Sequence, residues 1–132
     1  MSFRFEGIDH VQLAAPQDCE QKARAFFGEL LGWTELEKPA ALKDRCGVWF
    51  RCGMHEVHIG VQSSFIPALK AHPGFAVRGL EQLKEKLTAN GIGVIDDELR
   101  IEEGFRRFFA YDPFGNRLEF LERIETEEEG DG

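Results

Sequence analysis

The sequence predicts an α+β fold in which two βαβββ modules form curved mixed sheets around a cavity. Three observations lead to this prediction. Segments with period-two alternation of apolar and polar residues mark strands, stripes with helical spacing mark two helices, and the elements follow the same order in both halves of the chain. We expect a single domain over residues 1–125, with modules at about 6–62 and 70–122.

The first module begins with a strand and a helix. Residues 7–16 alternate as a strand does and end at a proline. An amphipathic helix is expected next, with Asp18 as its N-cap, Gln21 completing a capping box and Gly32 ending it. Its apolar stripe has helical spacing: Ala23, Phe26, Phe27, Leu30 and Leu31. Three strand-like segments complete the module: 33–38, 46–52 and 55–61.

The second module repeats this order after a connector at residues 62–71. A strand is expected at 72–77, followed by a helix with an apolar stripe at Leu80, Leu83 and Leu87 that stops at Asn90-Gly91. Three more strands are then predicted: 92–97, 106–112 and 117–122. The repeat therefore lies in the order of elements and not in residue identity.

Composition restricts the classes of partner. Of the 132 residues, 42% are apolar and 30% charged, as in ordinary globular domains. The net charge of −8 includes an acidic tail, which we expect to be disordered over 126–132, so nucleic acid is not an expected partner. No apolar run of membrane-spanning length and no signal peptide are present, which predicts a cytoplasmic protein without a membrane partner.

The cysteines do not indicate a framework of their own. Their number is odd and no CxxC spacing occurs, so neither a disulfide scaffold nor a zinc ribbon is predicted. A site built from two cysteines and two nearby histidines is conceivable, but its spacing matches no familiar zinc finger: Cys46, Cys52, His55 and His58.

Four ionisable residues lie on the polar face of their predicted strands, opposite the apolar side chains. His10 alternates with apolar neighbours, and so do His58, His72 and Glu119. His10 and His72 open the two modules 62 residues apart, and His58 and Glu119 lie on the closing strands 61 residues apart. One such residue is usually structural or solvated, but four at equivalent positions of two half-sheets favour a metal site.

The donor set indicates a class of ion. If the half-sheets face each other, they enclose three imidazoles and one carboxylate, which suit a divalent ion such as Zn, Fe, Ni, Mn or Co without selecting one. Gln12 is two residues after His10 and so lies on the same face of the predicted strand. We therefore expect it to face the cavity and to hydrogen-bond to a ligand. Trp49 either lines the cavity or belongs to the core.

Four segments carry a family resemblance: IDHVQL, FFGELLGW, HPGFAV and YDPFGNRLEF. Over residues 6–122 the sequence resembles the vicinal oxygen chelate superfamily, which includes glyoxalase I, fosfomycin-resistance enzymes, bleomycin-resistance proteins, methylmalonyl-CoA epimerase and extradiol dioxygenases. The resemblance implies metal ligands at His10, His72 and Glu119. His58 stands where glyoxalase I has a glutamate ligand, and Glu56, on the same face, is either its partner or a base.

The resemblance also implies an activity. We expect a metal-dependent, glyoxalase-like enzyme that binds a small oxygen-rich substrate by bidentate chelation and stabilises an oxyanion or enolate. Catalytic roles fall on Glu119, Arg107 and Gln12, because the family places substrate-contacting groups at the parity of Arg107. A homodimer is expected, and the site is formed either within one chain or across the dimer.

Two other functions remain open at this point. In one, His10, His72 and Glu119 form a two-histidine, one-carboxylate site for Fe(II) in a ring-cleaving dioxygenase. In the other, the protein is a non-catalytic binding protein that sequesters a drug, as bleomycin-resistance proteins do. Whether an enzyme of this type would be a lyase, an isomerase or a transferase does not follow from the sequence.

Overall fold

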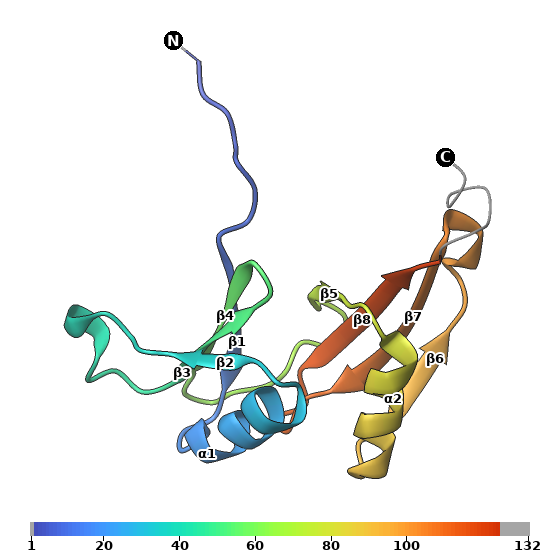
Figure 1. Ribbon diagram of the computed structural model, residues 1–132. Coiled ribbons are helices and arrows are strands. Elements are labelled where there is room, and N and C mark those ends of the chain that lie inside the picture. The colour runs from blue at the N-terminus through green and yellow to red at the C-terminus, as the bar shows by residue number, and fades with distance from the viewer. Residues whose placement is uncertain (1, 125–132) are drawn as a thin grey trace. The chain divides into compact units, whose positions relative to one another are not determined.

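The computed structural model describes residues 2–124, and the acidic tail predicted at 126–132 lies outside this range. The chain divides into two compact units at Ile66–Pro67, each built on one four-stranded mixed sheet (Figure 1). The predicted α+β class with two βαβββ modules is confirmed. Within the described residues, no helix has the length and apolar character needed to cross a membrane.

The first unit contains one sheet and a two-part helix. Its strands lie in the order β1-β4-β3-β2, with β1 parallel to β4 and the other neighbours antiparallel. The elements in chain order are β1 (His10–Ala15), α1 (Glu20–Ala23), the π-helix η1 (Arg24–Leu30), β2 (Thr34–Leu36), the 3₁₀ helix η2 (Ala40–Leu42), β3 (Val48–Cys52) and β4 (His55–Val61).

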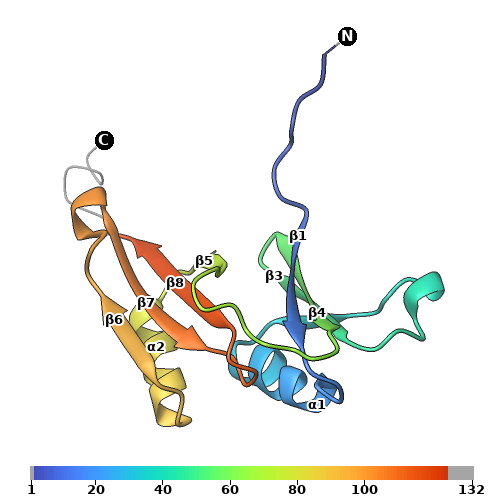
Figure 2. The same cartoon turned by 180° about the vertical axis from the view of Figure 1, so that it is seen from behind.

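The second unit repeats this topology. Its sheet has the order β5-β8-β7-β6, again with one parallel pair, between β5 and β8 (Figure 2). The elements are β5 (Gly74–Ala76), α2 (Leu80–Ala89), β6 (Val94–Asp97), the 3₁₀ helix η3 (Ile101–Glu103), β7 (Phe105–Tyr111) and β8 (Arg117–Arg123). The strand order shows that the two halves are structural repeats.

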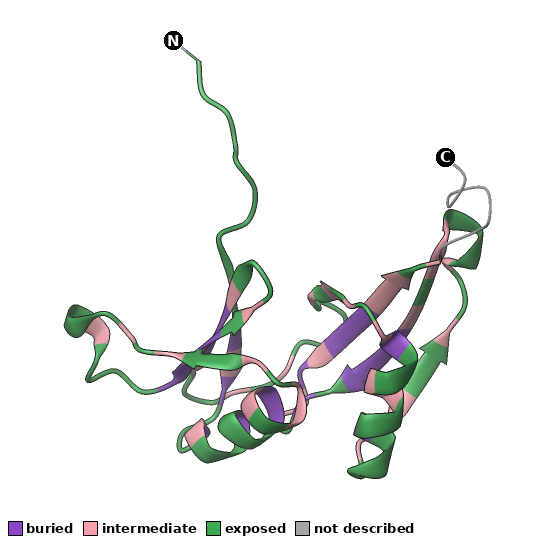
Figure 3. Ribbon diagram, in the orientation of Figure 1, coloured by how far each residue is buried: buried purple, intermediate pink, exposed green. Residues whose placement is uncertain are grey.

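Each unit has its own apolar core on the face predicted from alternation. The most buried side chains lie on the central strands and on the helices (Figure 3). In the first unit they include Phe27, Phe50, Val57 and Ile59, and in the second Leu87, Phe108, Leu118 and Phe120. His58 and Glu119, on the other face of β4 and β8, are also buried. These two side chains are therefore shielded from bulk water and need partners within the protein.

The predicted cap of the first helix is wrong. Asp18 adopts a left-handed backbone (φ +61°), and the helix begins after Cys19 without a side-chain cap. The helix then widens into a π-helix, with Leu31 N bonded to Phe26 O at 2.9 Å. The wider turn lets adjacent Phe26 and Phe27 both enter the core, their rings edge to face at 4.9 Å.

His72 does not lie on a strand, contrary to the prediction. β5 begins at Gly74, because Pro73 has no N–H to donate to a ladder. The carbonyl of Pro73 still accepts the N–H of Glu119 at 3.0 Å. This bond holds the segment that carries His72 beside β8.

Glu122 caps α2 from a neighbouring strand. The N-cap residue, Gly79, has no side chain, and the Glu122 carboxylate accepts the N–H groups of Gly79 and Leu80, both at 3.0 Å. These bonds lower the pKa of Glu122. We expect Glu122→Ala to reduce the free energy of unfolding at pH 7 by about 1–2 kcal/mol, as loss of a helix cap does.

The pH dependence distinguishes this role from simple packing. Because the pKa of Glu122 is lowered by folding, its stabilisation is present above the ordinary value of 4.5 and is lost as pH falls through the folded value. Urea unfolding should therefore show a difference between wild type and variant at pH 7 that shrinks on acidification. Glu85→Ala, an exposed site on α2, is the control and should change little. A loss for Glu122→Ala that does not change with pH would contradict the capping role.

Candidate functional site

The first unit stacks three rings on the polar face of its sheet. The His58 ring lies parallel to Trp49, with centroids 3.7 Å apart and planes 1° apart, and its other neighbour, His10, is 4.4 Å away. The strand register produces this stack, because Trp49 of β3 is the cross-strand partner of His58, and β1, which begins at His10, runs parallel to β4. Trp49 therefore contacts a predicted site residue.

The two histidines of this unit differ in their hydrogen bonds. His10 directs Nδ1 to Asp9 Oδ1 at 2.9 Å, and 44% of its side chain is exposed. His58 directs Nε2 to Glu56 Oε1 at 2.9 Å and is only 7% exposed. His10 thus keeps Nε2 available for a ligand, whereas His58 has Nδ1 as its remaining nitrogen.

Gln12 lies next to this stack on β1. It pairs in register with His58, and its amide passes over Gly60 of β4. A Cβ atom at Gly60 would lie 2.7 Å from the Gln12 amide nitrogen, so the glycine makes room for the side chain. Gln12 is exposed, which leaves its amide able to contact a ligand.

The second unit pairs His72 with Glu119. His72 Nε2 lies 3.0 Å from Glu119 Oε1, and His72 Nδ1 lies 2.7 Å from the carbonyl oxygen of Lys70. Both ring nitrogens therefore face acceptor oxygens. A neutral imidazole has only one N–H, so the tautomer decides which of the two oxygens receives it. Glu119, with 8% of its side chain exposed, has little water to compensate its charge.

Arg107 lies between two carboxylates. Its Nη1 donates to Glu119 Oε1 at 3.4 Å, and its Nε donates to Asp97 Oδ1 at 3.3 Å. Asp97 also accepts the N–H of Leu99, and this bond first, then Arg107, lowers the pKa of Asp97. Phe109, which is 5.3 Å from His72, has the guanidinium of Arg107 5.1 Å from its ring centroid. The guanidinium of Arg107 is thus divided between the carboxylates of Asp97 and Glu119.

The predicted metal ligands come together as two pairs, one in each unit. His10 stacks on His58, and His72 bonds to Glu119. Over residues 2–124, no three His, Cys, Asp or Glu side chains gather in a geometry that could hold a metal ion. The donor types still suit a divalent ion, and His10 and His72 both direct Nδ1 to an acceptor, which orients Nε2 for coordination.

The sequence did not identify three partners of these residues. Asp9 was adjacent to His10 and could have been recognised as its hydrogen-bond acceptor from the Asp-His dipeptide. Asp97 pairs across the β6–β7 hairpin with Arg107, but the loop between these strands hides the register. The Lys70 carbonyl is a backbone group and leaves no signal in the residue types.

The comparisons with known proteins agree with the repeated topology. The sequence model of the Glyoxalase/Bleomycin resistance protein/Dioxygenase superfamily matches residues 7–120. A crystal structure of a protein from Bacillus anthracis that is assigned to the glyoxalase family is 51% identical, with a TM-score of 0.88, and the match covers 93% of this chain and 99% of that one. None of the curated proteins matches this chain.

Two more distant structures share the fold. Lactoylglutathione lyase from Agrobacterium tumefaciens is 21% identical, with a TM-score of 0.68 and coverage of 89% of this chain and 93% of that one. The fosfomycin resistance protein FosX from Listeria monocytogenes is 18% identical, with a TM-score of 0.73 and coverage of 96% and 98%. At these identities the likeness shows the architecture alone.

Proposed function

This chain belongs to the Glyoxalase/Bleomycin resistance protein/Dioxygenase superfamily, and we propose that it is a metal-dependent enzyme acting on a small, oxygen-rich substrate. The observation that carries the proposal is His72, whose Nδ1 and Nε2 both face acceptor oxygens, at 2.7 and 3.0 Å. In the tautomer that donates Nδ1–H to the Lys70 carbonyl, Nε2 of His72 and the Glu119 carboxylate would both be able to hold a divalent cation. Members of the superfamily commonly use such ions.

We propose that the ion is held by His10 and His72 through Nε2 and by Glu119 through its carboxylate, with His58 as the fourth ligand. The donor set is one that suits Zn, Fe, Ni, Mn or Co. Asp9 and the Lys70 carbonyl orient the two Nε2 donors. His58 takes part through Nδ1, because Glu56 occupies its Nε2.

When bound, a divalent ion supplies Lewis-acid stabilisation of an oxyanion or enolate that forms on the substrate. The chain's own groups would do the rest. Gln12 binds a substrate oxygen through its amide, and the Trp49 face keeps the His58 ring in a fixed plane. Arg107 donates from Nη1 to Glu119 Oε1 at 3.4 Å and so offsets part of the negative charge of the carboxylate. Glu119 would also be the carboxylate of the set that could accept a proton from the substrate.

Metal analysis tests the proposal directly. The purified protein, stripped with chelator and titrated separately with Zn²⁺, Mn²⁺, Ni²⁺, Co²⁺ and anaerobic Fe²⁺, should bind one ion per chain for at least one of them. Light scattering of the same samples should give the mass of a homodimer, as members of the superfamily often form dimers. Absence of stoichiometric binding by every ion would overturn the metal-dependent function.

A further inference from the structure

A chain of charged contacts extends beyond the His72–Glu119 pair. Glu119 Oε1 receives contacts from both His72 Nε2 and Arg107 Nη1, and Arg107 continues through Nε to Asp97 Oδ1. The three side chains beyond His72 are largely shielded from water, with 8%, 17% and 21% of Glu119, Arg107 and Asp97 exposed. Arg107 is therefore divided between two carboxylates.

We propose that Asp97 is a positioning residue that keeps Glu119 available for a metal ion by holding one arm of Arg107. This inference rests on the proposed function, since it takes Glu119 as a ligand. No role in the site has been given to Asp97 by the family resemblance or by the sequence.

The reason is competition for one carboxylate. An arginine fork binds a carboxylate most strongly with two parallel N–H···O bonds. Here the fork is split, because Nε donates to Asp97 and Nη1 to Glu119. If Asp97 no longer accepts Nε, both arms can turn to Glu119 and form a bidentate pair. A metal ion must then displace a stronger partner from a poorly hydrated carboxylate.

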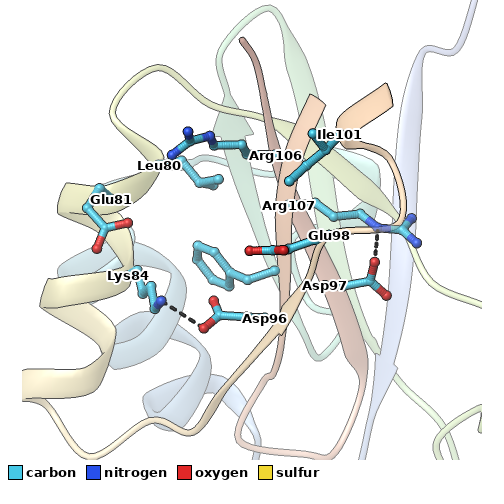
Figure 4. Close-up of a pocket in the computed structure, with 10 residues that line it drawn as sticks. Leu80, Glu81, Lys84, Asp96, Asp97, Glu98, Ile101, Arg106 and Arg107 are labelled. Carbon is cyan, nitrogen blue, oxygen red and sulfur yellow. Dashed lines mark hydrogen bonds and ion pairs between the residues drawn. The ribbon is translucent and has the colours of Figure 1, made fainter. Parts of the chain in front are cut away.

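Asp97 is well fixed for this purpose. It is the cross-strand partner of Arg107 at the end of β6, and its Oδ1 also accepts the N–H of Leu99 at 2.8 Å. Asp97 is consequently ionised at neutral pH, since these bonds lower its pKa. Its neighbour Asp96 bonds instead to Lys84 of α2, at 2.9 Å. Both aspartates line a pocket of about 230 Å³, in which Asp97 faces Arg107 and Asp96 faces Lys84 (Figure 4).

The first test is Asp97→Asn, which keeps an oxygen for the Leu99 N–H and Arg107 Nε but removes the negative charge. A neutral amide oxygen is a weaker acceptor than a carboxylate, so the guanidinium should turn to Glu119. Calorimetric titration with Zn²⁺ or Mn²⁺ should show affinity about ten- to a hundredfold below wild type, the range found when residues that orient metal ligands are changed. Asp96→Asn removes the same charge one residue away and should leave the affinity within about twofold. Equal affinities for wild type and Asp97→Asn would overturn the inference and leave the proposed function standing.

A double-mutant cycle separates positioning from the loss of a nearby negative charge. In an Arg107→Gln background, Asp97→Asn should no longer weaken metal binding, because the competing guanidinium is gone. If Asp97 instead acted by its own charge or by supporting the fold, Asp97→Asn would reduce the metal affinity by the same factor in both backgrounds. That result would contradict the proposal. Failure of wild type itself to bind metal would overturn the proposed function and this inference together.

Discussion

Replacing Glu119 by glutamine is expected to lower the affinity for the proposed divalent ion by at least about a hundredfold. Changing the partners that orient metal ligands already costs about ten- to a hundredfold, and Glu119 is the one anionic group in the proposed set of four. Glutamine has nearly the same shape and keeps an oxygen for Arg107 Nη1, so the fold should persist. The loss therefore reports coordination.

The matched control lies on the same strand. Glu122→Gln removes an equal charge from β8 at a position that bonds to the first N–H groups of α2. Calorimetry should give near wild-type metal affinity for this control and a large loss for Glu119→Gln. Circular dichroism should give the same spectrum for both variants. Unchanged affinity in Glu119→Gln would exclude Glu119 from the site.

Gly47→Ala is expected to cause the largest loss of stability, about 3 kcal/mol, from backbone strain and overpacking together. Gly47 has φ +105°, and a Cβ atom there would clash with the carbonyl oxygen of Ile59 in β4. The neighbour is backbone and cannot rotate away. Gly47 is also fixed by Glu20, whose Oε2 accepts its N–H at 2.7 Å, and by Lys38, which donates to its carbonyl at 3.0 Å.

A second glycine provides the comparison. Gly53 also has a positive φ, of +58°, but a Cβ atom there meets nothing within 4 Å. Gly53→Ala should therefore cost only the strain of a left-handed residue, about 1–2 kcal/mol. Urea unfolding of the two variants measures the difference. Equal losses would mean that the close approach to β4 does not control stability.

The strands were predictable because burial imposes a period of two. In β4 and β8, Val57, Ile59, Leu118 and Phe120 lie in the core while His58 and Glu119 take the other face, so alternation alone identified the polar parity. The repeat was also predictable, because both halves show the same order of one strand, one helix and three strands. The first and last strands of each half can pair in parallel only through such a long connection. Asn90-Gly91 marked the end of α2 correctly.

Other features depend on tertiary contacts that alternation does not encode. The π-helix follows from the burial of two adjacent aromatic rings, which local propensity cannot foresee. His72 lies outside β5 because Pro73 cannot donate to the ladder, an effect that the alternation of residue types does not show. Glu56, which the sequence places on the same face as His58, does bond to that ring, whereas Asp97, the partner of Arg107, depends on register across a hairpin. Partners are harder to predict than the strands that carry them.

The central claim is that ligands from both modules bind one ion. The most direct measurement is a crystal structure of the metal-loaded protein, with anomalous data collected at the absorption edge of the added metal. We predict a single anomalous peak that marks one ion. Its distances to His10 Nε2, His72 Nε2 and a Glu119 carboxylate oxygen should be about 2.0–2.2 Å, as for zinc. A loaded crystal in which these atoms bind no ion, or in which one module alone supplies every protein ligand, would contradict the account.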